Sequence, residues 1–215
     1  MEKSIESIWK KGFLKEDALV APKLNNLYNQ RSLNAVDKLF RMGRNNLIFI
    51  VVGAIVVFGI TIAMGIPYSG AGVFILLMIT VYYGKKQGEH AQEINKGLNS
   101  HQYLVEVKVW MNKTIDGYTY LYRFIYPAFV ILFTLGGWYS SLGKAFFEEM
   151  RNNTPELVTL FGVPALFWAV LLVISALFSV FARAIYMADL KTVYGGIFQK
   201  IDTLLDEMEE LSTEK

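Results

Sequence analysis

The longest stretch without a charged residue, residues 47–84, limits most strongly what this chain can fold into. Pro67, Ser69 and Gly70 interrupt its apolar character near the middle. A bilayer core of ~30 Å takes about 20 helical residues, so the stretch is too long for one crossing and suits two crossings joined by a tight turn. We therefore expect a transmembrane helical hairpin over residues 46–84.

Two later runs without charge, residues 124–143 and 157–182, predict two more crossings within residues 123–182. A short external loop, residues 143–156, would join them. The share of hydrophobic residues, 53%, is also typical of a membrane protein. The sequence thus predicts an all-α integral membrane protein, a four-helix bundle with cytoplasmic helical extensions.

Lysine and arginine lie almost entirely on one side of these crossings. Nine precede residue 47, six lie within residues 85–123 and four follow residue 182, whereas the external loop has only Lys144 and Arg151. Basic residues are retained on the cytoplasmic face of a membrane. We therefore expect both termini inside, in a multi-pass protein of the bacterial inner (cytoplasmic) membrane.

The N-terminal segment, residues 1–45, has the pattern of amphipathic helices at the cytoplasmic surface. Pro22 predicts a break, and Ser32 predicts the N-cap of a second helix that leads into the first span. Four apolar residues at helical spacing predict a face for a partner or an interface: Ile5, Ile8, Trp9 and Phe13.

Basic residues beside the first two spans are typical of contacts with lipid headgroups. They are Lys38, Arg41 and Arg44 before the first span, and Lys85 and Lys86 after the second. A cation near an anionic leaflet contributes ~1 kcal/mol to membrane attachment. The sequence therefore predicts membrane lipid as a partner, through a general electrostatic anchor.

Two further cytoplasmic segments are expected to be helical: residues 85–122, with a break near residues 114–117, and residues 183–215. In the last segment, apolar spacings of three and four alternate, which is typical of a coiled-coil helix that packs along a seam. The seam residues are Met187, Leu190, Tyr194, Ile197, Ile201, Leu204, Met208 and Leu211. They predict pairing either with a second copy, in a homo-oligomer, or with the 85–122 helix of the same chain.

The sequence offers little for catalysis, cofactors or metals. It has no cysteine, and no ionisable side chain lies in the four spans. The two histidines, His90 and His101, would lie about 16 Å apart on one helix, too far to share a metal ion. The common nucleotide, nucleophile and zinc motifs are missing, and the basic residues form no nucleic-acid patch. We therefore expect no enzyme activity, cofactor, metal or nucleic-acid partner.

The first forty residues carry a resemblance to a known group of proteins. The matching residues are Ile8-Trp9-Lys10, Gly12-Phe13, Asp17-Ala18, Ala21-Pro22-Lys23, Leu27-Tyr28-Asn29, and Ser32 through Val36-Asp37-Lys38. This run resembles the start of small four-span membrane proteins of Bacteroidetes-type bacteria, which are associated with genes for extracytoplasmic-function sigma factors. The resemblance implies an inner-membrane protein whose cytoplasmic N-terminal segment holds a regulatory partner such as a sigma factor.

Two functions stay open on the sequence. The concentration of polar sequence on one side favours a non-enzymatic protein that assembles through its cytoplasmic helices and tethers or regulates a cytoplasmic protein, in the manner of an anti-sigma factor. The alternative is an oligomeric channel or passive transporter, lined by hydroxyl groups of the spans. Those residues are Thr61, Thr80, Thr134, Ser175 and Ser179, and each hydroxyl could instead bond to its own helix.

Overall fold

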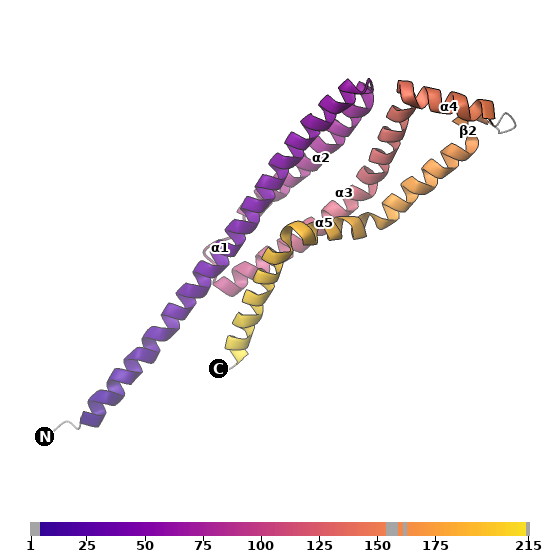
Figure 1. The fold of residues 1–215 in the computed structure, drawn as a ribbon. Helices are drawn as coiled ribbons and strands as arrows, with labels where there is room; N and C mark the ends of the chain where they lie inside the picture. Colours follow the sequence, from indigo (N-terminus) through magenta and orange to yellow (C-terminus); the bar gives the residue numbers. More distant parts are fainter. Residues whose placement is uncertain (1–4, 154–158, 161–162, 214–215) are drawn as a thin grey trace.

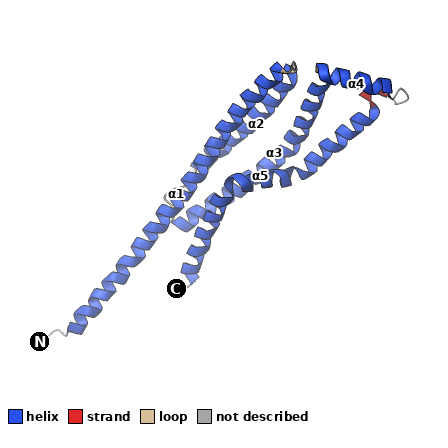
Figure 2. Ribbon diagram, in the orientation of Figure 1, coloured by secondary structure: helices blue, strands red, loops and turns tan. Residues whose placement is uncertain are grey.

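The computed structural model describes residues 5–153, 159–160 and 163–213, with side chains from residue 27 to residue 210 except at 142 and 151. Helices dominate the described chain (Figure 2). They are α1 (Ile5–Ala63), α2 (Pro67–Gln92), α3 (Ser100–Tyr139), α4 (Ser141–Asn153) and α5 (Ala165–Thr213). Two short antiparallel strands, β1 (Thr159–Leu160) and β2 (Val163–Pro164), precede α5.

Four of these helices, α1, α2, α3 and α5, are long and apolar enough to cross a membrane. The prediction of an all-helical protein with four spans is therefore confirmed. Many large apolar side chains on these helices face outward, including Phe49 at 73% and Val180 at 74% exposure. Such a surface is stable in lipid rather than in water, so the chain is a multi-pass membrane protein.

The helices form two antiparallel hairpins (Figure 1). In the first, α1 and α2 join at a tight turn, where Gly65 has φ +74° and the Ile66 N–H donates to the Thr61 carbonyl at 2.9 Å. Glycine reaches this left-handed conformation without a Cβ penalty. In the second hairpin, α3 and α5 lie side by side, with α4 across their end (Figure 1). The end with the Gly65 turn and α4 is called the turn end below.

The charge-free parts of α1, α2 and α5 end close to one another, at the level of residues 116–118 of α3. A side chain at Gly84 of α2 would meet Leu47 of α1 and Tyr118 of α3, and Arg183 of α5 lies 3.9 Å from Asp116 of α3. The charge-free parts of these four helices are residues 47–63, 67–84, 124–139 and 165–182, and they are called the spans below. About 17 residues rise ~26 Å, close to the bilayer core.

Beyond this level lies the charged end, where α1, α3 and α5 form a three-helix bundle with an apolar core. Core residues from all three helices are at most 5% exposed: Val36 and Leu39 of α1, Leu104 and Val107 of α3, and Ile201 and Leu204 of α5. Burial of apolar surface away from water is the main stabilising term of such a core. The main core of the described chain therefore lies outside the spans.

Three predictions about helix ends on the N-terminal side of the spans are wrong. Helix α1 runs without a break through Pro22 and Ser32, and α3 runs without a break through residues 114–117. Ser32 lies fully buried beside the bundle core, so tertiary packing overrides its capping preference. Gly117 serves a close helix contact, because a Cβ there would collide with the Tyr83 ring.

The connection between the third and fourth spans also differs from the prediction. Most of the segment expected as a loop forms helix α4. Pro164, expected inside the fourth span, lies in β2 directly before α5. Proline has no N–H to donate within a helix, and this position just before the first turn requires none.

Candidate functional site

The seam residues of α5 pack inside the chain. Leu190, Ile197, Ile201 and Leu204 are 6%, 4%, 0% and 4% exposed. Tyr194 and Met208 are partly buried against the same core, Met187 is half-buried, and Leu211 lies outside the described side chains. The buried positions pack against α1 and α3. The heptad pattern left open whether the seam pairs with a second copy or within the chain, and in the structure it pairs within the chain.

The predicted N-terminal face lies on the backbone of α1, whereas the side chains of Ile5, Ile8, Trp9 and Phe13 lie outside the described residues. Figure 1 shows that the N-terminal part of α1 extends beyond the bundle, past the ends of α3 and α5. We call residues 5–26 the N-terminal arm. The structure therefore separates the arm from the part of α1 that builds the core.

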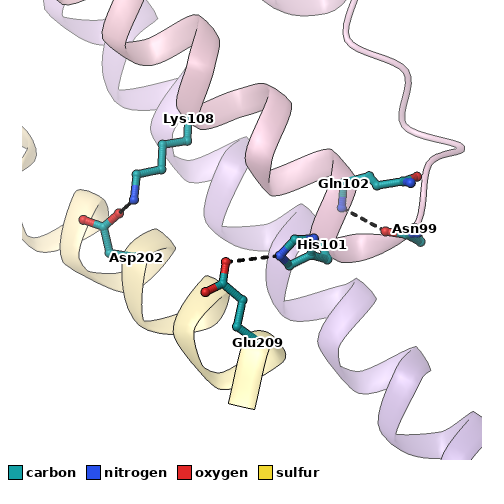
Figure 3. Close-up of polar contacts among 6 residues, drawn as sticks. All are labelled: Asn99, His101, Gln102, Lys108, Asp202 and Glu209. Atoms are coloured by element: carbon teal, nitrogen blue, oxygen red, sulfur yellow. Dashed lines mark hydrogen bonds and ion pairs between the residues drawn. The ribbon is translucent and has the colours of Figure 1, made fainter. Parts of the chain in front are cut away.

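Polar contacts hold α5 to α3 in the bundle (Figure 3). Lys108 Nζ lies 2.7 Å from Asp202 Oδ1, and His101 Nε2 lies 3.5 Å from Glu209 Oε1. The hydrogen bond to Asp202 raises the pKa of Lys108. Both pairs are about half exposed, so each contributes at most ~1 kcal/mol. Their main effect is to fix the register of α5 on α3.

Asn99 caps the start of α3 at the same end. Its Oδ1 accepts a hydrogen bond of 2.8 Å from the Gln102 backbone N–H (Figure 3). An N-cap asparagine satisfies a helix N–H that has no partner within the helix. The cap fixes where α3 starts and so orients His101 and Lys108 toward α5.

A cavity of about 980 Å³ lies between α1, α2, α3 and α5, where the spans meet the charged end. Its apolar lining includes Leu47 and Ile50 of α1 and Met111 and Ile115 of α3. Its aromatic lining consists of Phe40, Trp110, Tyr118, Tyr122, Tyr186, Tyr194 and Phe198. The cavity therefore has an apolar side continuous with the spans.

The tyrosines of the cavity pack on one another. The Tyr118 ring lies 4.8 Å from Tyr83 and 5.8 Å from Tyr186, and the Tyr122 ring lies 5.1 Å from Tyr186. Trp110 is held in place by a hydrogen bond of 3.1 Å from its Nε1 to the Gln87 carbonyl. These contacts join α2, α3 and α5 and give the cavity a fixed wall with polar hydroxyl groups.

Charged residues also line the cavity, and several have no ion-pair partner among the described residues. Lys85 pairs with Glu89 at 4.0 Å, and Asp37 pairs with Lys96 at 3.9 Å. The remaining charged lining residues are Lys38, Arg41, Arg44 and Asp189, none of which forms an ion pair with another described residue. The cavity thus has an excess of positive charge.

Four of the five predicted headgroup residues line this cavity. Lys38, Arg41 and Arg44 come from α1 and Lys85 from α2, whereas Lys86 does not line it. Sequence reasoning missed the aromatic wall. The spacing of Tyr118, Tyr122 and Tyr126, one every four residues, would have indicated a single aromatic face at the start of the third span.

Two of the hydroxyl residues considered for a channel lining are bonded to their own helix. Thr61 Oγ1 donates to the Phe58 carbonyl at 2.8 Å, and Thr80 Oγ1 donates to the Leu76 carbonyl at 3.2 Å. Ser175 is buried, and its hydroxyl has no hydrogen-bond partner among the described residues. Within the described part of the chain, no group of three His, Asp or Glu side chains could hold a metal ion.

No protein-family model, curated protein or solved structure matches the chain. The class of protein is therefore described from its fold. It is a helical multi-pass membrane protein whose long helices extend into a bundle at one end.

Proposed function

We propose that the protein is a non-enzymatic adaptor of the bacterial inner membrane that tethers or regulates a cytoplasmic protein. One observation carries the proposal: α1, α3 and α5 each continue from a span into the charged-end bundle as a single helix. A partner bound at the charged end is thereby held at the membrane by continuous helices. In the sequence, 19 of the 21 basic residues fall before the first span, between the second and third, or after the fourth, which supports a cytoplasmic location for these segments.

The distribution of structure supports an adaptor over a channel. The charged end has the three-helix bundle and the N-terminal arm, whereas the turn end has the Gly65 turn, two short strands and α4. Thr61 and Thr80 donate their hydroxyl hydrogens to carbonyls of their own helices, which leaves these two groups without a donor for a path. The channel alternative therefore has less support.

The N-terminal arm is the surface we assign to the partner. It extends beyond the bundle (Figure 1) and carries Ile5, Ile8, Trp9 and Phe13 at helical spacing. A sigma factor is the class of partner that the resemblance of this segment suggests. The seam of α5 is already covered by the same chain, so a homo-oligomer would form through another surface.

Reporter fusions test the orientation. A fluorescent protein fused after Lys215 should fold and fluoresce in the cytoplasm, and alkaline phosphatase at the same position should be inactive. Phosphatase inserted after Asn152, between the third and fourth spans, should be active. The reverse pattern would contradict the proposal.

A pull-down from native membranes tests the partner. The full chain is compared with a chain that lacks residues 2–26 but keeps the bundle positions Tyr28, Val36 and Leu39. We expect a cytoplasmic protein to be captured by the full chain only. Equal capture by both chains, with melting temperatures that are also equal, would exclude the arm as the docking surface.

A further inference from the structure

We propose that the cavity between α1, α2, α3 and α5 binds a single phospholipid with an anionic phosphate headgroup, of the phosphatidylglycerol type. This goes beyond the adaptor function and does not depend on it. A general electrostatic anchor needs only basic residues at the membrane surface. A binding site needs a concave volume lined by both apolar and charged side chains, and the cavity, which is partly open to its surroundings, has these features.

The depth of the cavity suits a lipid of the leaflet next to the charged end. Leu47 and Ile50 belong to the first turn of the α1 span, and Tyr186 lies one turn beyond the α5 span. An amphiphile at this level would place its acyl chains against the spans and its headgroup toward the charged end. An inorganic phosphate ion would leave most of the 980 Å³ and the apolar wall without a partner.

The charges favour a phosphate diester. Lys38, Arg41 and Arg44 follow one another at intervals of three, which places them on neighbouring positions of one helix face. They line the cavity and form no ion pair with a described residue. Guanidinium groups bind phosphate oxygens through paired hydrogen bonds, which a point charge cannot do.

The other polar groups favour a headgroup with hydroxyl donors. Asp189 of α5 lines the cavity from a different helix and is an acceptor without a described ion-pair partner. Tyr118 and Tyr186 also line the cavity, and a tyrosine hydroxyl can donate or accept a hydrogen bond. A glycerol headgroup offers donors to Asp189 while its phosphate meets the arginines, whereas a choline headgroup offers no donor.

Binding of short-chain lipids to the full purified protein in detergent tests the proposal. The ligands are dihexanoyl phosphatidylglycerol, dihexanoyl phosphatidylcholine and glycerol 3-phosphate. Binding of each is measured as the shift in the melting temperature of the protein. We expect phosphatidylglycerol to bind at least tenfold more tightly than the other two. Equal binding of phosphatidylcholine would overturn the charge argument, and equal binding of glycerol phosphate would overturn the lipid assignment.

A matched pair of variants separates a built site from a general anchor. Arg41→Gln combined with Arg44→Gln should weaken phosphatidylglycerol binding at least tenfold. Arg31→Gln removes a cation from the same helix outside the cavity lining and should leave binding unchanged. Equal weakening by both changes, or by neither, would contradict the proposal.

A labelling experiment keeps the arginines intact, in case the double variant does not fold. The chain has no cysteine, so single cysteines can be introduced cleanly. Gly88 lines the cavity with open space for a Cβ, and Lys86 is exposed outside it. Phosphatidylglycerol should slow maleimide modification of the Gly88→Cys variant at least fivefold, without slowing that of Lys86→Cys. Equal rates with and without lipid at Gly88→Cys would overturn the site.

Discussion

The charged-end bundle and the membrane spans are parts of the same helices, yet they pack in opposite ways. Eleven buried residues form a closed core in the bundle. In the most apolar windows of α1 and α5, only 11% and 17% of the residues are buried inside the protein. Water drives apolar side chains together, whereas lipid tails solvate them as well as other side chains do. The same backbone therefore follows two packing rules on the two sides of the boundary.

The spans associate through small residues instead. A Cβ at Gly136 of α3 would collide with Ser69 of α2, and one at Gly72 of α2 would collide with Leu132 of α3. Glycine at such positions lets helix backbones approach closely, which gives packing contacts without a hydrophobic drive. Large apolar side chains stabilise the bundle, whereas the spans pack closely where glycine has no side chain.

The largest effect is expected from a charge in the bundle core. Ile201→Asp places an unpaired carboxylate at a position that is 0% exposed, and we expect a loss of more than ~4 kcal/mol of bundle stability. Thr203→Asp, two residues away and exposed, is the control and should have little effect. Thermal unfolding in detergent measures both. A melting temperature unchanged in the Ile201→Asp variant would show that this residue is not in a core.

A smaller apolar change compares the two regions directly. Leu104→Ala in the bundle core should cost about 2–5 kcal/mol, because it leaves a cavity. Leu172→Ala, at a lipid-facing position that is 68% exposed, should cost less than ~0.5 kcal/mol. Denaturant titration in mixed micelles gives both free energies of unfolding. Similar losses at the two positions would contradict the two packing rules.

The packing rule for the spans predicts a different sensitivity. Gly136→Leu should cost about 1–3 kcal/mol, because the side chain meets Ser69 and pushes α3 away from α2. Gly137→Leu is the matched control, since nothing lies within 4 Å of a Cβ there. Resistance of the purified protein to unfolding by dodecyl sulfate should fall for Gly136→Leu alone.

The smallest effect is expected from the ion pair between α3 and α5. Asp202→Asn removes the charge that faces Lys108 at 2.7 Å, and we expect a loss of at most ~1 kcal/mol because both side chains are about half exposed. The difference from the unsubstituted protein should shrink as salt is added. A loss as large as that of Leu104→Ala would mean that polar contacts, not the core, stabilise the bundle.

The sequence was sufficient to predict four apolar helices long enough to cross a membrane. Runs without charge such as residues 47–84 have one physical explanation, because charges are costly in lipid and every backbone group must bond within the helix. Breaks in the helices were harder to predict. Pro22 and Gly117 are breakers in isolation, but both lie inside continuous helices. At Gly117 the close contact with Tyr83 of α2 favours continuation of the helix, so local propensity is a weak signal there.

Contacts between different helices, in the bundle and in the cavity, could not be predicted from the single sequence. The heptad repeat of α5 identifies Ile197, Ile201 and Leu204 as a packed face. The repeat does not identify which helix packs against that face. The cavity is assembled from four helices that are far apart in the sequence. Arg41 and Lys85 were predicted individually as headgroup contacts. That they line one cavity with Asp189 and Tyr186 depends on the packing of both hairpins.

Helices α1, α3 and α5 of one chain continue beyond their spans and meet in one bundle. Lys108→Cys combined with Asp202→Cys, in this otherwise cysteine-free chain, is the decisive test of this arrangement. A short bismaleimide added to the protein in lipid vesicles should give a cross-linked monomer at high yield. A covalent dimer would show that the seam joins two copies, and no cross-link would show that α3 and α5 do not meet.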